Sequence, residues 1–146
     1  RDRSVSRGLG DVYKRQIPGL SVPVRGVIDL VQHDLTAVDY KSAAAKPDAG
    51  HAAFDHELQL VTYQMMIEEA TGDTPPSLDL IYLAKTKMPQ VIRVKIHPAN
   101  EQRKQRIADL YRIACEGITT ERFHPQPGMQ CSWCQYRKEC SGWCRQ

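Results

Sequence analysis

The sequence of 146 residues lacks any long apolar run, and this argues against a membrane-spanning protein. A transmembrane helix needs about 20 consecutive apolar residues, and no stretch here approaches ~18. The N-terminus also lacks the apolar segment of a secretory signal peptide. We therefore expect a cytoplasmic protein with no membrane partner.

Cysteine is missing from most of the chain: none precedes Cys115, and all five lie in the C-terminal part. An odd number clustered late does not suit a secreted disulfide framework. It suits metal ligands in a reducing compartment better. A large excess of one charge is also missing, since the net charge is only +3. This value permits a nucleic-acid partner without demanding one. The length suits one domain with a single core.

Residues 1–16 have neither helical nor strand periodicity. They hold five Lys and Arg against two Asp, so most of the net charge comes from them. The stretch resembles the translated sequencing-adapter tail that recurs at the ends of proteins predicted from assembled reads. We expect it to be non-native and outside the fold, with the natural chain beginning upstream of Ile17. The alternative is a basic disordered arm that binds nucleic acid.

Two runs rich in β-branched residues predict a β-hairpin within residues 17–42, with its turn at Gln32–Asp34. Asp29 lies near the end of the first run and Asp39 near the end of the second. Pairing the two strands through a short turn can bring these carboxylates side by side. Because adjacent carboxylates repel each other and lose hydration energy, folding alone gives little reason to keep them together.

A divalent cation would remove this conflict, and carboxylate oxygens suit Mg²⁺ or Mn²⁺. Asp39 and Lys41 should share one face of the strand, with Tyr40 on the other. Lys41 could orient a water or stabilise charge on a phosphate. The alternative is ordinary: Asp29 ends a strand, and Asp39 with Lys41 is a solvated edge pair.

A largely buried helix is predicted over Ala53–Ala70, ended by Thr71-Gly72. Gln59 and Tyr63 lie four residues apart and therefore share one helix face. Such a pair is usually a satisfied polar patch. Alternatively it faces the carboxylates and binds a phosphate or a base.

The remaining elements are two strands, Leu78–Ala84 and Val91–Ile96, and an amphipathic helix over Pro98–Gly117, with Gly117 as its C-cap. In the loop between the strands, Lys85 and Lys87 either contact a phosphate backbone or are solvated loop tips. Cys115 should be a packed core thiol.

Residues 123–146 are too polar and too interrupted to form a core of their own. They contain the spacing Cys-x2-Cys-x5-Cys at Cys131, Cys134 and Cys140, which can turn three thiolates toward one metal. Cys144 is a candidate fourth ligand. Zinc and an iron–sulfur cluster both remain open, since thiolates bind either.

Taken in order, these motifs resemble the PD-(D/E)XK nuclease superfamily in its RecB-like branch, which includes Cas4-type and AddB-type exonucleases. The resemblance covers nearly everything from Gly19 to Cys140. It rests on four motifs: Gly26-Val27-Ile28-Asp29, Asp39-Tyr40-Lys41, Gln59-Leu60-Val61-Thr62-Tyr63 and the late cysteine spacing. It implies an α/β fold: residues 17–122 as a restriction-endonuclease-like core with a central mixed β-sheet flanked by helices, and 123–146 as a cysteine-rich metal-binding segment.

The resemblance also implies hydrolysis of DNA phosphodiester bonds with Mg²⁺ or Mn²⁺ as cofactor. Asp29, Asp39 and the carbonyl of Tyr40 would hold the metal. Lys41 would position or activate the water. A helical Gln-x-x-x-Tyr pair, here Gln59 and Tyr63, would help to hold the DNA strand near the metal.

The same resemblance implies a 4Fe–4S cluster on Cys131, Cys134 and Cys140, with Zn²⁺ as the alternative. The family's iron–sulfur members have four cysteines, the first well upstream of the hairpin, and this chain has none there. An upstream helix with a further His or Glu metal ligand is also absent. Both departures fit an N-terminally truncated chain whose cluster is incomplete, unless Cys144 substitutes.

The expected function is therefore a metal-dependent DNA exonuclease in repair, recombination or CRISPR adaptation. Its DNA would be single-stranded or have free ends, and its partner would be a helicase or a CRISPR-adaptation protein. The alternative is a non-catalytic, cluster-stabilised DNA-binding or scaffold module of the same fold, although such a module gains nothing from two clashing carboxylates. A small zinc-binding interaction domain with an unrelated sheet would leave Asp29, Asp39 and Lys41 unexplained.

Overall fold

The computed structural model describes residues 9–17, 20, 22–122 and 124–142. The chain divides into two compact units, which we call the sheet unit (Arg1–Arg112) and the cysteine unit (Ile113–Gln146). Each is described by itself. No helix in the described ranges combines the length and the apolar character needed to cross a membrane.

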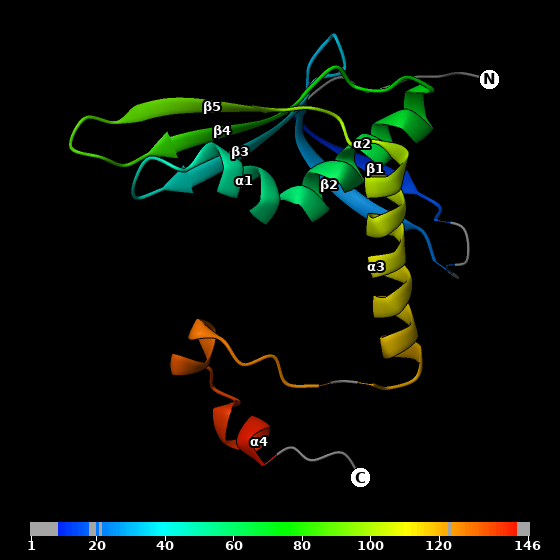
Figure 1. Ribbon diagram of the computed structural model, residues 1–146, viewed down its shortest axis with the longest axis vertical. Helices are drawn as coiled ribbons and strands as arrows, with labels where there is room; N and C mark the ends of the chain where they lie inside the picture. The colour runs from blue at the N-terminus through cyan, green and yellow to red at the C-terminus, as the bar shows by residue number, and fades with distance from the viewer. Residues whose placement is uncertain (1–8, 18–19, 21, 123, 143–146) are drawn as a thin grey trace. The chain divides into compact units, whose positions relative to one another are not determined.

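One mixed sheet runs through the sheet unit (Figure 1). Its strands, in spatial and chain order, are β1 (Leu9–Arg15), β2 (Val24–Val31), β3 (Ala37–Ala43), β4 (Leu78–Ala84) and β5 (Gln90–Ile96). Neighbours are antiparallel except β3 and β4, which are parallel. Parallel neighbours need a long crossover, and the chain supplies it as α1 (Ala49–Asp55) and α2 (Glu57–Thr71). The expected mixed sheet flanked by helices is confirmed.

Strand β1 corrects one expectation about residues 1–16. Leu9–Arg15 pairs antiparallel with β2, and Tyr13 is buried in the core. The expectation that this stretch lies outside the fold is therefore wrong for these seven residues, while residues 1–8 lie outside the described part. Backbone pairing along an open strand edge depends little on side-chain pattern, so a segment without strand periodicity can still pair there. Its origin as an adapter-derived tail stays a prediction.

Helix α2 forms the centre of the core. Its residues from Leu60 to Ile67 are all buried. One side packs on the sheet, where it meets Ile28 and Leu80 in a single apolar cluster. The other side faces the first turns of α3 (Glu101–Thr119), which place Lys104 against Glu68. Burying a Leu or Ile side chain fully contributes about 1.5–3 kcal/mol, so this helix is fixed between two layers.

The single helix predicted over Ala53–Ala70 is in fact two helices. His56 has a non-helical backbone (φ −106°, ψ 11°) and separates α1 from α2. Helix α1 also begins earlier than expected, because Asp48 caps it by accepting a hydrogen bond from His51 N at 2.9 Å. The predicted end of α2 is confirmed, with Gly72 in the left-handed conformation at φ 84°.

The later elements follow the predictions with shifted ends. Strand β4 has the predicted bounds, and β5 begins one residue early. Helix α3 begins after Pro98, because Asn100 Oδ1 accepts a hydrogen bond from Arg103 N at 3.0 Å. It also continues through Gly117 to Thr119, so the predicted C-cap at Gly117 is wrong.

The cysteine unit has little packed structure among its described residues. After α3 it contains a 3₁₀ turn (Met129–Ser132) and α4 (Arg137–Ser141), and no described side chain of the unit is buried. This confirms that the segment has no core of its own. Cys115 is partly exposed and not the packed core thiol that we expected.

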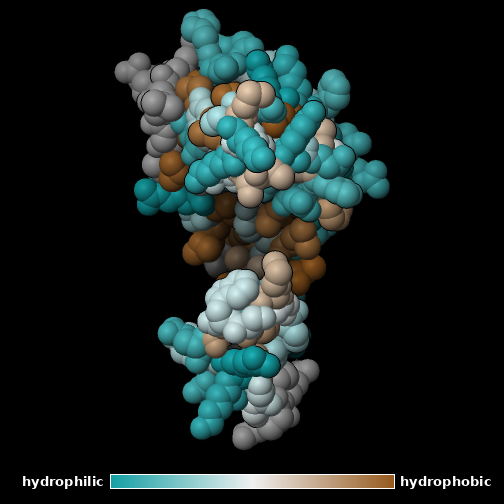
Figure 2. Space-filling view, turned by 90° about the vertical axis from the view of Figure 1, so that its left-hand side faces the viewer, coloured by the Kyte–Doolittle hydropathy of each residue, from teal (hydrophilic) through white to brown (hydrophobic). Residues whose placement is uncertain are grey.

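Hydrophilic side chains cover much of the face drawn in Figure 2, with apolar side chains exposed among them. In the sheet unit, the exposed large apolar side chains include Val27, Leu58, Leu83, Met88 and Val91. Contiguous exposed apolar surface often marks a binding site, and two of these side chains reappear beside the candidate site below.

A buried glutamine joins α2 to the segment before α3. Gln64 is fully buried; its Nε2 donates to Ala99 O at 3.0 Å, and its Oε1 accepts from Ala99 N at 2.7 Å. The N–H and the C=O of Ala99 therefore both form their hydrogen bonds with the Gln64 side chain.

We predict that Gln64→Met destabilises the chain although it keeps the helix propensity and the size of the side chain. Each backbone group left without a partner costs about 1–3 kcal/mol. The measurement is urea unfolding followed by circular dichroism. Gln102→Met, on an exposed position of α3, is the matched control and should change stability by less than about 0.5 kcal/mol. Equal stability of the two variants would contradict the role of Gln64.

Candidate functional site

The ladder between β2 and β3 stops where the two acids lie. The strands pair at Val31–Ala37 and Leu30–Val38. In this register the next opposed residues are Asp29 and Asp39, and the paired positions do not extend to them. Instead, Asp29 Oδ2 accepts a hydrogen bond from Tyr40 N at 2.9 Å. The Asp29 carboxylate thus accepts the hydrogen bond that a backbone carbonyl of the neighbouring strand accepts elsewhere in the sheet. The hairpin therefore brings Asp29 next to the segment that carries Asp39.

Strand β2 changes its side-chain alternation at the same point. Ile28 and Val31 both belong to the core cluster, although alternate residues of a strand normally share a face. The alternation of core-facing and outward-facing side chains therefore changes at Asp29 and Leu30. A change of this kind turns the Asp29 side chain to a new direction, as a β-bulge does. Just before it, β2 approaches α2 closely: a Cβ on Gly26 would lie 2.9 Å from the Met66 sulfur.

Asp39 is buried, with only 2% of its surface exposed. Its Oδ1 accepts a hydrogen bond from Gln59 Nε2 at 2.8 Å. Its Oδ2 lies 2.6 Å from Lys41 Nζ, but at an angle that makes no hydrogen bond. Among the described residues, this buried oxygen has no hydrogen-bond partner. The ion pair with Lys41 compensates the charge of Asp39, but its Oδ2 keeps lone pairs that no hydrogen-bond donor uses. A metal ion could use them.

Gln59 connects the acid, the lysine and Tyr63 through one carboxamide. Its Nε2 donates to Asp39 Oδ1 and to the Tyr63 hydroxyl, both at 2.8 Å. Its Oε1 accepts from Lys41 Nζ at 2.9 Å. Tyr63 in turn donates to Val27 O at 2.9 Å. The helix-facing pair predicted from the sequence thus lies against the hairpin, and it ties α2 to both strands.

The electrostatics of Tyr63 reflect its position beside the acids. Burial raises the pKa of Tyr63 above its ordinary value of 10.0, and the negative charges of Asp39 and Asp29 raise it further, while the hydrogen bond from Gln59 opposes them. Tyr63 is therefore protonated near neutral pH and can keep donating to Val27 O.

The donors at this site fit a hard divalent cation. Asp39 Oδ2, the Asp29 carboxylate and the Tyr40 carbonyl are oxygen ligands of the kind that Mg²⁺ prefers, and Mg²⁺ commonly uses one or two carboxylates with waters or phosphates completing its shell. Nowhere in the described ranges do three or more His, Cys, Asp or Glu side chains form a group that could hold a metal. The fit therefore rests on two acids.

The late cysteines are not brought together as the sequence led us to expect. Cys134 and Cys140 are exposed, and Cys131 Sγ accepts a hydrogen bond from Gly128 N at 3.3 Å. Cys144 lies outside the described residues. The predicted cluster of Cys131, Cys134 and Cys140 thus has no geometric support in the part that the structure describes.

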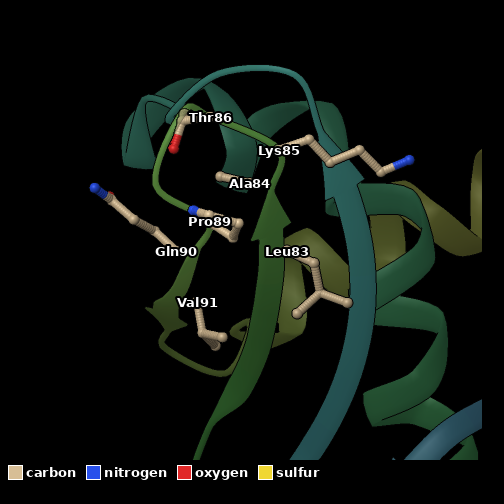
Figure 3. Close-up of a pocket in the computed structure, with 7 residues that line it drawn as sticks. All are labelled: Leu83, Ala84, Lys85, Thr86, Pro89, Gln90 and Val91. Atoms are coloured by element: carbon tan, nitrogen blue, oxygen red, sulfur yellow. The ribbon is translucent and has the colours of Figure 1, made fainter.

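Two hollows in the sheet unit differ in their relation to the acids. One, of about 260 Å³, includes Gln59 and Tyr63 in its wall. The other, of about 290 Å³, lies around the β4–β5 turn and is lined by Leu83, Ala84, Lys85, Thr86, Pro89, Gln90 and Val91 (Figure 3). Its one charged side chain, Lys85, extends away from the others. With no acid in its lining, the larger hollow is not a candidate metal site.

Comparison with known proteins agrees with this geometry. Residues 4–141 match the family described as the PD-(D/E)XK nuclease superfamily. A protein from Eubacterium rectale named "Putative exonuclease" superposes with a TM-score of 0.65 at 13% identity, over 92% of this chain and 52% of that one. The protein SSO0001 gives 0.57 at 16% identity, over 92% and 59%. No curated protein matches the chain.

Identities this low show the fold alone. The chain also spans only a little more than half the length of these two structures. Activity, substrate and partners of a whole protein are therefore inferred from the site and not from the superposition.

We predict that Tyr63 titrates above its ordinary pKa, because burial and then the charges of Asp39 and Asp29 raise that pKa. The measurement is tyrosinate absorbance against pH in wild type and in Tyr63→Phe. The difference between the two curves reports Tyr63 and should rise only above pH 10, the ordinary pKa of a tyrosine. The pKa of Tyr63 is higher in the folded state than in the unfolded state. The stability that protonated Tyr63 contributes is therefore fully present below its unfolded-state pKa and is lost as the pH rises through its folded-state pKa. Asp39→Asn should lower the transition, since it removes one negative charge.

Circular dichroism at each pH serves as the control that the fold persists. A Tyr63 transition at its ordinary pKa in wild type, unmoved by Asp39→Asn, would show that the acids do not lie beside the phenol.

Proposed function

This chain belongs to the PD-(D/E)XK nuclease superfamily, and from that premise we propose that it is a metal-dependent DNA exonuclease. The observation that carries the proposal is the buried carboxylate of Asp39. Its Oδ2 accepts no hydrogen bond, Lys41 Nζ lies 2.6 Å from that oxygen, and the Asp29 carboxylate lies beside the same strand segment. A solvated edge pair would not be buried. The name of the Eubacterium rectale relative supports the choice of exonuclease.

In this proposal, Asp29, Asp39 and the Tyr40 carbonyl hold Mg²⁺ or Mn²⁺. When bound, the ion would lower the pKa of a water and neutralise phosphoryl oxygens. Lys41 Nζ, fixed by Gln59 Oε1 at 2.9 Å, is placed to orient that water or to stabilise charge developing on the phosphate.

The structure refines the role that we propose for the Gln-x-x-x-Tyr pair. Both amide hydrogens and the carbonyl oxygen of Gln59 are engaged by Asp39, Tyr63 and Lys41. Gln59 is therefore a positioning residue for the acid and the lysine. Tyr63, bonded to Val27 O, anchors this arrangement and stays a candidate to hold the DNA strand beside it.

The setting of the activity is a further proposal that rests on the RecB-like resemblance alone. We propose single-stranded DNA or free DNA ends as substrate, and repair, recombination or CRISPR adaptation with a helicase or adaptation protein as context. A non-catalytic DNA-binding module of the same fold is the competing function. The experiment below separates the two, because that module would bind DNA without hydrolysing it.

We predict that Lys41→Ala lowers cleavage of single-stranded DNA ends in Mn²⁺ by about 10²–10⁴-fold, the usual contribution of a positioned catalytic group. Thermal unfolding should show an intact fold, because Lys41 is only partly buried. Lys46→Ala, an exposed lysine in the loop after β3, is the matched control and should keep full activity.

Asp39→Asn tests the metal in the same assay. It should lose both cleavage and Mn²⁺ affinity measured by calorimetry, whereas Lys41→Ala should keep most of the affinity. Full Mn²⁺-dependent activity in Lys41→Ala would refute the proposed mechanism. DNA binding with no hydrolysis in wild type would favour the non-catalytic module.

We also propose that Cys131, Cys134 and Cys140 bind a metal, either as a 4Fe–4S cluster or as Zn²⁺. The support is the ligand spacing alone. Elemental and sulfide analysis of anaerobically purified protein should give iron with sulfide, or zinc. Cys134→Ser should lower the content of whichever metal is found.

Cys144→Ala decides whether Cys144 is a fourth ligand, because loss of a ligand should lower the same metal content. A metal-free wild type would remove the proposal.

A further inference from the structure

The hollow beside Gln59 has a wall that the proposed chemistry does not use. It measures about 260 Å³ and lies among β2, α2 and the first part of α3. All of its lining residues belong to the sheet unit: Arg25, Gly26, Val27, Leu58, Gln59 and Thr62, with Tyr63 and Tyr111. The hollow shares Gln59 and Tyr63 with the candidate metal site and so opens directly beside it.

One apolar side chain of this wall, Leu58, stays open to solvent and is 46% exposed. It lies outside the packed core and directly precedes Gln59 of the hydrogen-bonded network. Leaving such a side chain in water forgoes about 25 cal/mol for each Å² of apolar surface not buried, so a ligand with an apolar face would gain by covering it.

An aromatic side chain on another element completes the wall. Tyr111, from α3, is partly buried, and its hydroxyl lies 3.0 Å from Thr62 Oγ1. This contact holds the ring at a fixed place on α2, 49 residues away in sequence. A ring held in this way can stack on a planar ligand with little loss of conformational entropy.

Arg25 supplies the one positive charge of the lining, and its side chain is exposed. A fixed aromatic side chain beside an exposed aliphatic one is the kind of surface on which bases of single-stranded nucleic acid stack. A hollow near 260 Å³ is somewhat smaller than the ~300–1,000 Å³ that suits a drug-sized ligand. It therefore suits one nucleotide and not a duplex.

We infer that this hollow binds one unpaired nucleobase of the DNA strand whose phosphate the metal proposed at Asp39 would hold, with Tyr111 and Leu58 contacting the base. The inference rests on the proposed function and deepens it. A base that is paired in a duplex cannot enter the hollow, so the site would select single strands or frayed ends through base stacking and not through a sequence-specific contact.

The test is binding of an oligonucleotide of about 10 nucleotides, within the usual single-strand site sizes, followed by fluorescence anisotropy in EDTA to prevent cleavage. A series of oligonucleotides carries one abasic site at each position in turn. In wild type, one position should weaken binding about 5- to 100-fold, the range expected for the loss of one stacked base. In Leu58→Ala and Tyr111→Ala, intact DNA should bind more weakly by a similar factor, and the abasic site should add little.

Two variants guard against misfolding. Tyr111→Phe keeps the ring and loses the contact with Thr62, so it should bind within about threefold of wild type while Tyr111→Ala does not. Leu83→Ala is the matched control, because Leu83 is 49% exposed and belongs to the other hollow; it should bind as wild type does.

The outcomes separate this inference from the proposed function. Equal binding of every abasic oligonucleotide by wild type, or equal affinity for blunt duplex and single strand, would overturn the base pocket even if the protein cleaves DNA. A base-dependent loss confined to one position, abolished in Leu58→Ala, would support the pocket even if no cleavage is found in Mn²⁺.

Discussion

The carboxamide of Gln59 is the contact on which the candidate site depends. Asp39 and Lys41 project from the same strand and form an ion pair, with Nζ 2.6 Å from Asp39 Oδ2. Gln59 donates to the acid and accepts from the lysine, so each keeps a defined orientation. It can do so because the turns of α2 that follow it are buried on all sides. Side chains on a rigid, well-packed element keep a more precise position than side chains on a loop. Gln59 belongs to α2, the most deeply packed described helix of the sheet unit.

A second buried acid shows how unusual Asp39 is. Asp79, on the neighbouring strand β4, is completely buried, yet its carboxylate is satisfied by the Ser77 hydroxyl and the Arg93 guanidinium. The same sheet therefore contains one buried carboxylate that is fully paired and another, Asp39, that keeps an oxygen without a hydrogen bond. Asp39 is ion-paired with Lys41, but a buried oxygen that accepts no hydrogen bond costs stability, so the contrast supports the proposed metal at Asp39.

Local patterns allowed the hairpin and its acids to be predicted from the sequence, because strand alternation and turn residues fix which side chains meet across ten residues. The helix break at His56 was missed because no capping side chain marks it within a continuous apolar pattern. Contacts between distant elements were missed for another reason. The two hydrogen bonds of Gln64 with the Ala99 backbone and the hydroxyl contact of Thr62 with Tyr111 leave no periodic signal in the sequence. The pairing of β1 was missed because backbone edges accept strands of almost any sequence.

The network of the proposed metal site occupies one continuous part of the chain, from Val27 to Tyr63. A short turn and the α1 segment are the connections between β2, β3 and the start of α2 there. Most residues that line the proposed base hollow lie in or beside this same stretch, and only Tyr111 comes from α3. Exchange of α3 is therefore the change that could alter contacts to the base while leaving the proposed metal ligands in register.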